Sequence, residues 1–105
     1  MDKKAVLVII SDFRKILEAS GVRPQKLVLF GSFANGNEHQ DSDIDIAVIS
    51  EDFEGKGYWE RIDLLSDAIY KIFKPIEAVA MTPKEWQQND SLIANYARGG
   101  EVVYG

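Results

Sequence analysis

The segment that most constrains the fold of this 105-residue chain is a polar, glycine-containing loop between two apolar runs, LFGSFANGNEHQDSDIDIAVI at residues 29–49. The first run, KLVLF at residues 26–30, ends at a glycine and is typical of a buried strand. The second run, residues 43–49, starts with alternating polar and apolar residues and then stays apolar, which predicts a central strand. The polar loop between them, residues 31–42, has room for one helical turn from Ser32.

Helical and strand patterns alternate along the rest of the chain. Thr82-Pro83-Lys84-Glu85 combines an N-cap, a proline at the first helical position and a capping-box glutamate. Residues 50–57 read as a polar loop, and Phe73 is the last apolar residue of the helical pattern before Pro75. The other expected elements are helices at residues 3–19, 58–73 and 91–98 and strands at residues 76–81 and 101–104. This order predicts one layered α+β (α/β) domain over residues 1–105.

Composition narrows the classes of partner. The formal charge is −5 and the twelve basic residues are scattered, so a nucleic acid is not expected as the main partner. No apolar run reaches the roughly 18 residues of a membrane span, and the charges after the first apolar run favour a helix over a signal peptide. The chain has no cysteine, which fits a reducing compartment. We therefore expect a cytoplasmic protein without a membrane partner, as a monomer or in a homo- or hetero-oligomer.

The second strand begins with a pair of acidic residues, Asp43 and Asp45. Because successive side chains of a strand point to opposite faces, both carboxylates lie on one face of the strand and Ile44 and Ile46 on the other. Adjacent carboxylates repel one another, and a hard cation such as Mg²⁺ reverses that repulsion. By itself, an Asp-x-Asp pattern is also typical of a solvent-exposed strand face.

The Gly31-Ser32 turn follows the first strand directly. A glycine there lets the backbone bend and approach a ligand closely. Ser32 offers a hydroxyl and a backbone N–H to a phosphate, or caps a short helix. Ordinary turn chemistry explains this pair as well, so the turn alone does not identify a site.

Strand direction joins these two features. If the first two strands are antiparallel, Gly31-Ser32 lies at the same edge of the sheet as Asp43 and Asp45. The third strand follows a helix, so we expect it to run parallel to the second and to begin at that same edge. Glu77 is the charged residue at its start, within the apolar run PIEAVAM. Three carboxylates and a candidate phosphate turn are thus predicted to converge.

These residues resemble a known family signature. Gly31-Ser32, ten intervening residues and then Asp43-Ile44-Asp45 are similar to the motif of minimal nucleotidyltransferases (MNT domains) of the DNA polymerase beta-like superfamily. Short members of that family are often the antitoxin partners of HEPN-domain toxins. The resemblance covers nearly the whole chain. It implies the nucleotidyltransferase fold, a mixed β-sheet of three to four strands with helices packed against it.

The resemblance also implies an activity. Gly31 and Ser32 would bind the nucleotide, while Asp43, Asp45 and Glu77 would be the catalytic and metal-binding residues. The reaction would be a Mg²⁺-dependent transfer of a nucleoside monophosphate, AMP from ATP, to a hydroxyl. Two metals would stabilise the attacking and leaving oxygens. The acceptor would be a partner protein, with a HEPN-family toxin as the candidate.

Two positions depart from the family pattern. Members commonly carry a basic residue in a GS-x-A-R-G or GS-x-A-K-G form, where this chain has Asn35 in GSFANG. The third acid is often aspartate and here is Glu77. Both departures favour an alternative function, a non-catalytic antitoxin subunit that neutralises its partner by binding alone. A transferase acting on a small molecule would normally need an extra substrate domain, which this sequence does not contain.

Three further residues were assigned by their place in the pattern. Arg61 lies on the second long helix, and we predict a solvent-exposed position for it. Trp59 and Trp86 begin helices, and packing or burial in an interface is favoured over stacking on a base.

Overall fold

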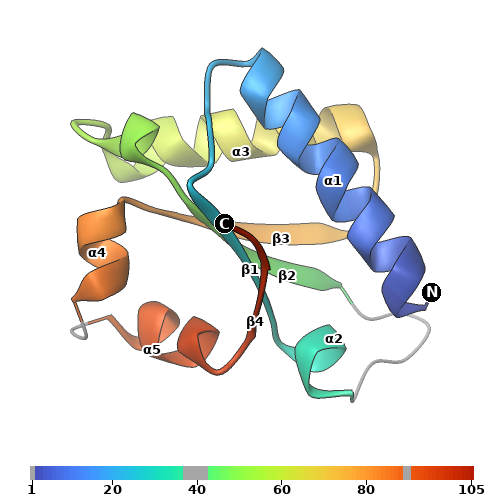
Figure 1. Ribbon diagram of the computed structural model, residues 1–105. Helices are drawn as coiled ribbons and strands as arrows, with labels where there is room; N and C mark the ends of the chain where they lie inside the picture. The colour runs from blue at the N-terminus through green and yellow to red at the C-terminus, as the bar shows by residue number, and fades with distance from the viewer. Residues whose placement is uncertain (1, 37–42, 89–90) are drawn as a thin grey trace.

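The computed structural model describes residues 2–36, 43–88 and 91–105 and shows a mixed sheet with helices on both faces (Figure 1). The strands are β1 (Lys26–Phe30), β2 (Ile44–Ile49), β3 (Ile76–Met81) and β4 (Glu101–Tyr104). The helices are α1 (Lys3–Ala19), α2 (Ser32–Asn35), α3 (Tyr58–Ile72), α4 (Pro83–Gln87) and α5 (Leu92–Arg98), with a short 3₁₀ helix η1 (Glu51–Phe53). The predicted α+β fold class is confirmed, and the predicted elements agree with the observed ones to within one residue at each shared end.

The sheet has the strand order β3-β2-β1-β4. β1 and β2 are antiparallel, with Phe30 opposite Asp45, whereas β2 and β3 are parallel, with Asp45 opposite Glu77. The parallel pairing follows from α3, because a helical connection returns the chain to the edge at which β2 began. β4 pairs antiparallel with the other side of β1. Both strand directions expected from the sequence are therefore confirmed.

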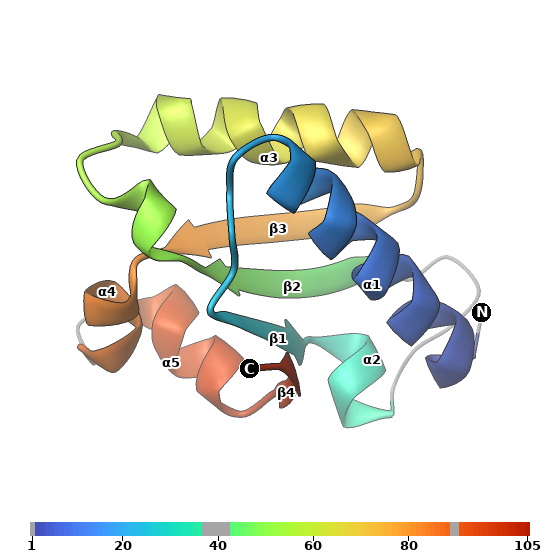
Figure 2. The same cartoon turned by 45° about the horizontal axis from the view of Figure 1, so that its top comes forward.

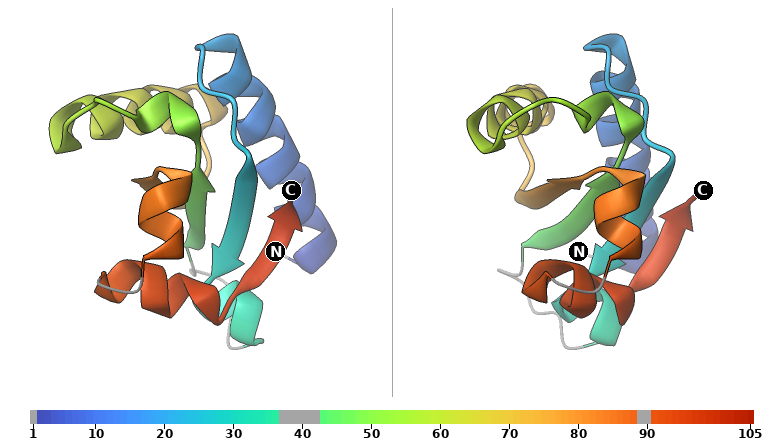
Figure 3. Two further views of the ribbon diagram at one scale, coloured as in Figure 1. Left: turned by 60° about the vertical axis from the view of Figure 1, so that its left-hand side comes forward. Right: turned by 90° about the vertical axis from the view of Figure 1, so that its left-hand side faces the viewer.

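The central strands are buried on both faces. Helices α1 and α3 cover one face of the sheet, and α4 and α5 lie against the other (Figures 2 and 3). In β1, Leu27 and Leu29 belong to the cluster under α1 and α3, whereas Val28 and Phe30 belong to the cluster under α5. A fully buried aliphatic side chain contributes roughly 1.5–3 kcal/mol. These strands therefore form a rigid base for the residues at their ends.

Two phenylalanines differ from the sequence-based expectation. Phe53 lies in the segment read as a polar loop, yet its side chain is fully buried at the end of η1. Phe73 was placed on the apolar face of the helix, but it is 87% exposed and has a left-handed backbone (φ 53°) that ends α3. The prediction was wrong for Phe73 because the helix stops one residue earlier, and its left-handed C-cap turns the side chain away from the core.

Arg61 connects three parts of the structure. Its Nε donates to the carbonyl oxygen of Lys56 (2.9 Å), and its Nη1 donates to Oε1 of Glu85 (2.6 Å). The guanidinium carbon lies 5.9 Å from the centre of the Phe53 ring. Only 17% of the Arg61 side chain is exposed, so the predicted solvent-exposed position is wrong. These contacts tie the start of α3 to the loop before it and to α4.

The two tryptophans differ in their surroundings. Trp86 packs against the cluster under α5, and the Arg98 guanidinium lies 4.7 Å from its ring centre. Trp59 is 73% exposed, so packing within the chain is wrong for this residue, and burial in an interface stays a prediction. Among the described residues, no helix combines the length and apolar character needed to cross a membrane.

The Arg61–Glu85 pair predicts a pH-dependent contribution to stability. A hydrogen bond from Arg61, aided by the backbone N–H of Thr82 and opposed by burial, holds the pKa of Glu85 below its ordinary value of 4.5. The stabilisation is therefore complete above pH 4.5 and is lost as the pH falls through the lowered pKa. Glu85→Gln keeps an oxygen for the capping box but removes the charge, so we expect it to lower the free energy of unfolding at pH 7 by up to about 1 kcal/mol.

Urea unfolding at several pH values measures this effect. The difference between the wild type and Glu85→Gln should shrink toward zero as the pH falls below 4.5 and through the lowered pKa of Glu85. Glu54→Gln is the control, because Glu54 is exposed and has no ion-pair partner among the described residues. A stability difference that stayed constant across the pH range would contradict this account of the ion pair.

Candidate nucleotide and metal site

The three predicted carboxylates lie at one edge of the sheet. Asp43 precedes β2 and is exposed, Asp45 is the second residue of β2 and is partly buried, and Glu77 is the second residue of β3 and is exposed. Asp45 and Glu77 are directly opposite one another in the parallel ladder. The structure therefore brings together acidic residues that are more than thirty positions apart in the sequence.

These carboxylates perturb one another electrostatically. A hydrogen bond with Asp43 and the negative charges of Asp43 and Asp45 raise the pKa of Glu77 above its ordinary value. Burial, together with the charge of Asp43, raises the pKa of Asp45, and a hydrogen bond with Glu77 opposes that rise. Ionised carboxylates are thus unfavourable neighbours here, as expected for groups that share a site for a positive charge.

Position 31 requires a glycine for two reasons, a close contact with the Asp45 side chain and a left-handed backbone conformation. Gly31 has φ 72°, in the left-handed region, and it is the N-cap of α2. A Cβ built on Gly31 would overlap Oδ2 of Asp45 and lie only 3.0 Å from its Cγ. Any larger residue would therefore displace the carboxylate, so Gly31 sets the position of Asp45.

Ser32 begins the single helical turn expected in the loop. It is the first residue of α2, and no side chain caps the N-terminus of this turn. Asn35 is the last residue of α2, and Gly36 ends the turn in a left-handed conformation. The rest of the loop, residues 37–42, lies outside the described residues. Ser32 and Gly31 are adjacent to the carboxylates through the pairing of Phe30 with Asp45.

The residues present fit a divalent cation that is shared with a ligand. Within residues 2–36, 43–88 and 91–105, no group of three or more Asp, Glu, His or Cys side chains is arranged so that it alone could hold a metal ion. Mg²⁺, however, is usually held by one or two carboxylates together with waters and substrate phosphates rather than by an all-protein cage. The carboxylates of Asp43, Asp45 and Glu77 repel one another and lie beside the Gly31 turn. This arrangement suits a cation that is bound partly by the protein and partly by a phosphate ligand.

Comparison with known proteins decides the family. The family model "Polymerase beta, Nucleotidyltransferase" matches residues 12–105, which include every residue of the site described above. The chain belongs to this nucleotidyltransferase family. The resemblance seen in the sequence motif is thereby confirmed.

One relative and two solved structures are similar to the chain. It is 38% identical over 56 residues to protein adenylyltransferase MntA of Shewanella oneidensis, a match that covers 52% of this chain and only 40% of that relative. A predicted nucleotidyltransferase from Sulfolobus solfataricus has a similar crystal structure, with TM-score 0.71, 16% identity, and coverage of 93% of this chain and 78% of the other. A toxin–antitoxin crystal structure with AMP-PNP has TM-score 0.65 and 22% identity, and covers 90% and 72% of the two chains. The two structures confirm the nucleotidyltransferase fold.

Sequence reasoning missed the contact between Gly31 and Asp45. A glycine at the end of a strand indicates a turn, but no local pattern shows which side chain packs against it. The register of β1 and β2, set by Phe30 opposite Asp45, creates the contact. A count of residues along the two strands could have suggested the pairing, although not the direction of the Asp45 carboxyl group.

Gly31→Ala tests this contact. Gly31 and Gly55 have nearly the same left-handed backbone (φ 72° and 73°), but a Cβ at Gly55 would meet no atom within 4 Å. Gly55→Ala should therefore cost only the backbone strain, about 1–2 kcal/mol, whereas Gly31→Ala should cost more and should also move Asp45. We expect Gly31→Ala to lower the affinity for Mg²⁺-ATP at least about tenfold, a change of about 1.4 kcal/mol.

Isothermal titration calorimetry with Mg²⁺-ATP, together with urea unfolding, measures both effects. Gly55→Ala should bind Mg²⁺-ATP like the wild type. Equal affinities for the two alanine variants would show that the Gly31–Asp45 contact does not position the site.

Proposed function

We propose that this protein transfers AMP from ATP, in the presence of Mg²⁺, to a hydroxyl group on a partner protein. The observation that carries the proposal is the pairing of Asp45 with Glu77 beside the Gly31 turn. Carboxylate oxygens are the ligands that Mg²⁺ prefers, and a glycine backbone lets a phosphate come close, so their proximity supports a site for both. Membership in the nucleotidyltransferase family gives the class of reaction.

The reaction is an in-line displacement at phosphorus. The acceptor oxygen forms a bond to the α-phosphorus, the bond from that phosphorus to the oxygen bridging to the β-phosphate breaks, and pyrophosphate leaves. Mg²⁺, when bound, supplies positive charge that stabilises the attacking and leaving oxygens. The protein contributes mainly orientation and charge placement, which this site can provide without a histidine base.

Each residue of the site has a proposed role. The Gly31-Ser32 backbone and the Ser32 hydroxyl hold the triphosphate. Asp43 and Asp45 hold the metal, and the fixed position of Asp45 against Gly31 sets where the metal lies. Glu77 completes the carboxylate set and accepts the proton of the incoming hydroxyl, for which its exposed place on the outermost strand is suitable.

Two comparisons support the finer assignments. A relative that is 38% identical over 56 residues is named a protein adenylyltransferase, which supports AMP as the transferred group and a protein as the acceptor. The chain also shares its fold with a component of a toxin–antitoxin structure that contains AMP-PNP. Together with the resemblance of the motif to minimal nucleotidyltransferases that partner HEPN-domain toxins, this supports a HEPN-family toxin as the proposed acceptor.

Asn35 favours a second candidate function, neutralisation of the partner by binding alone. A basic residue at this position would help to neutralise phosphate charge, and asparagine removes that help. Glu77, in place of the more common aspartate, lengthens the third carboxylate side chain. In this alternative the fold serves as a binding surface for the partner, and the site has lost its catalytic use.

Incubation with α-labelled ATP, Mg²⁺ and the purified partner from the neighbouring gene separates the two functions. We expect label on the partner, reduced at least about a hundredfold by Asp45→Asn, because removal of a metal ligand costs several kcal/mol of transition-state stabilisation. Asp63→Asn is the matched control, since Asp63 is an exposed aspartate on α3.

Analytical sedimentation of the same mixtures gives the second readout. A stable complex with no label on the partner would overturn the enzyme and support the binding subunit. Equal labelling by the wild type and Asp45→Asn would show that the chemistry does not take place at this site.

A further inference from the structure

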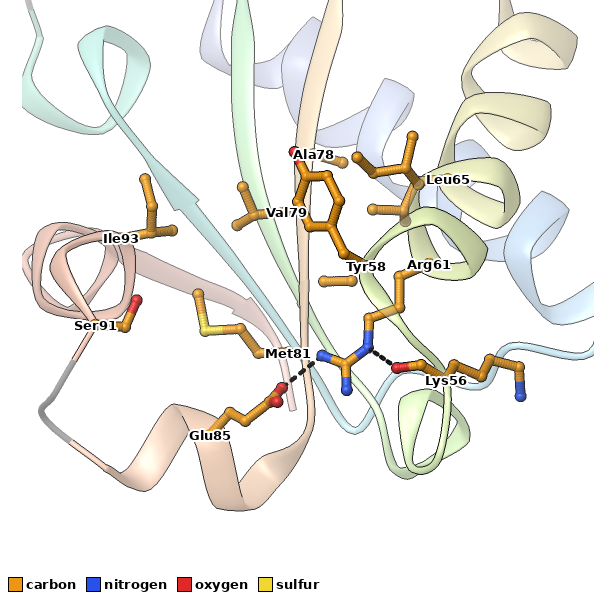
Figure 4. A pocket seen from close by; sticks show the side chains of 12 residues that line it. Lys56, Tyr58, Arg61, Leu65, Ala78, Val79, Met81, Glu85, Ser91 and Ile93 are labelled. Carbon is orange, nitrogen blue, oxygen red and sulfur yellow. Dashed lines mark hydrogen bonds and ion pairs between the residues drawn. The ribbon is translucent and has the colours of Figure 1, made fainter.

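A groove follows the outer side of β3. It has a volume of about 460 Å³ and lies between the start of α3 and helices α4 and α5 (Figure 4). Ala78 and Ala80 of β3, Tyr58 and Leu65 of α3, and Ile93 of α5 are among the residues that line it. We call this feature the β3 groove. At the Met81 end, the Arg61–Glu85 ion pair spans the two walls, as the dashed line in Figure 4 shows.

The floor of the groove is an unpaired strand edge. β3 is the outermost strand on its side of the sheet, and β2 is its neighbour. The N–H of Ile44 donates to the carbonyl oxygen of Pro75 (2.8 Å), and the N–H of Ser50 donates to that of Met81 (2.9 Å). Odd-numbered residues of β3 therefore direct their backbone groups to β2. Because backbone direction alternates along a strand, Ala78 and Ala80 direct theirs into the groove.

Such an edge can accept an extended peptide. The outward N–H and C=O groups of an edge strand form a template for a further strand, the mode of peptide recognition called β-augmentation. Many proteins block exposed edges with charged side chains or proline. The outward-bonding positions of β3 carry the small side chains of Ala78 and Ala80, which leave the backbone accessible.

The rims of the groove carry exposed side chains. Tyr58 lines the groove from α3 and is 69% exposed, and its ring forms an edge-to-face pair with that of Trp59, with ring centres 5.0 Å apart. On the opposite side, Ile93 lines the groove from α5 and is 45% exposed. Tyrosine and tryptophan are the residues most enriched among those that dominate binding energy in interfaces. Both rims thus offer surface to a bound segment.

The groove lies next to the candidate catalytic site along β3. Glu77 immediately precedes Ala78 in β3, and Asp45 lies opposite Glu77. A strand advances about 3.3 Å per residue, so the residues of an added strand that pair near Ala78 would have side chains within reach of the three carboxylates.

We propose that the β3 groove binds an extended, basic segment of the acceptor protein as an added strand and so delivers its hydroxyl to Asp43, Asp45 and Glu77. This proposal rests on the function proposed above. Charge selects the occupant. Within the groove, Arg61 pairs with Glu85 and Lys56 Nζ donates to the carbonyl oxygen of Asp52, whereas the Glu77 end leads to three carboxylates, and the chain as a whole carries −5. A second copy of the chain would add a further −5, whereas a segment rich in lysine or arginine complements this end of the groove.

Hydrogen exchange gives a direct backbone test. In the free protein, the amides of Ala78 and Ala80 should exchange much faster than that of Val79, which is bonded to β2. The probe is a set of decapeptides selected for binding from a displayed random library, and we expect the selected sequences to be basic. Their addition should slow exchange at Ala78 and Ala80 at least about tenfold, because these amides become hydrogen-bonded.

Variants test the same contact without using the catalytic residues. Ala80→Pro removes an outward N–H, a change that an edge strand tolerates, and Tyr58→Ala removes an exposed aromatic residue that lines the groove. Each should weaken binding of the selected peptides at least about tenfold. Tyr70→Ala is the matched control, because Tyr70 is an 82% exposed aromatic residue of α3 that does not line the groove. All three variants should bind Mg²⁺-ATP like the wild type.

The outcomes separate this proposal from the proposed function. Peptide binding that is lost in Ala80→Pro but kept in Asp45→Asn supports the groove, even if no AMP is transferred. Selected peptides that bind Ala80→Pro and Tyr58→Ala as tightly as the wild type would overturn it. So would selection of acidic peptides, unchanged exchange at Ala78 and Ala80, or a homodimer in sedimentation that Ala80→Pro dissociates.

Discussion

The structure depends on one tight contact, the carboxyl group of Asp45 against the bare backbone of Gly31. The antiparallel register of β1 and β2 creates this contact, and the parallel register of β2 and β3 adds Glu77 on the other side of Asp45. The same contact leaves no room for a side chain at Gly31. It also holds Asp45 partly buried and close to two other acids, an arrangement that is costly without a cation.

Apolar packing of the buried sheet offsets the free-energy cost of placing these carboxylates close together. β1 and β2 bury side chains on both faces, so strand ends that carry polar residues are fixed by apolar packing further along the same strands. Electrostatic repulsion at the strand ends therefore does not disturb the register. Proteins often place such unfavourable groups at functional sites and stabilise them through the surrounding structure. Membership in the polymerase beta nucleotidyltransferase family agrees with that interpretation.

Much of the fold could be predicted from the sequence because its local signals agree with one another. Apolar periodicity, the capping box at Thr82 and the glycine turns located the elements, and strand direction placed Gly31, Asp45 and Glu77 at one edge. The errors have two causes. Phe73 is exposed because α3 ends one residue before it in a left-handed C-cap. The burial of Phe53 and Arg61 depends on contacts between distant segments, which no local pattern contains. The β3 groove was missed for the same reason, since α3, α4 and α5 together form its walls.

The central claim is that the carboxylate edge and the Gly31 turn hold a divalent cation together with a triphosphate. A crystal structure with Mn²⁺ and a non-hydrolysable ATP analogue tests it most directly, because Mn²⁺ is located by its anomalous scattering. We predict an anomalous peak within coordination distance of Asp43 and Asp45, with the phosphates against the backbone of Gly31 and Ser32. A nucleotide bound elsewhere, or a peak distant from these carboxylates, would contradict the account.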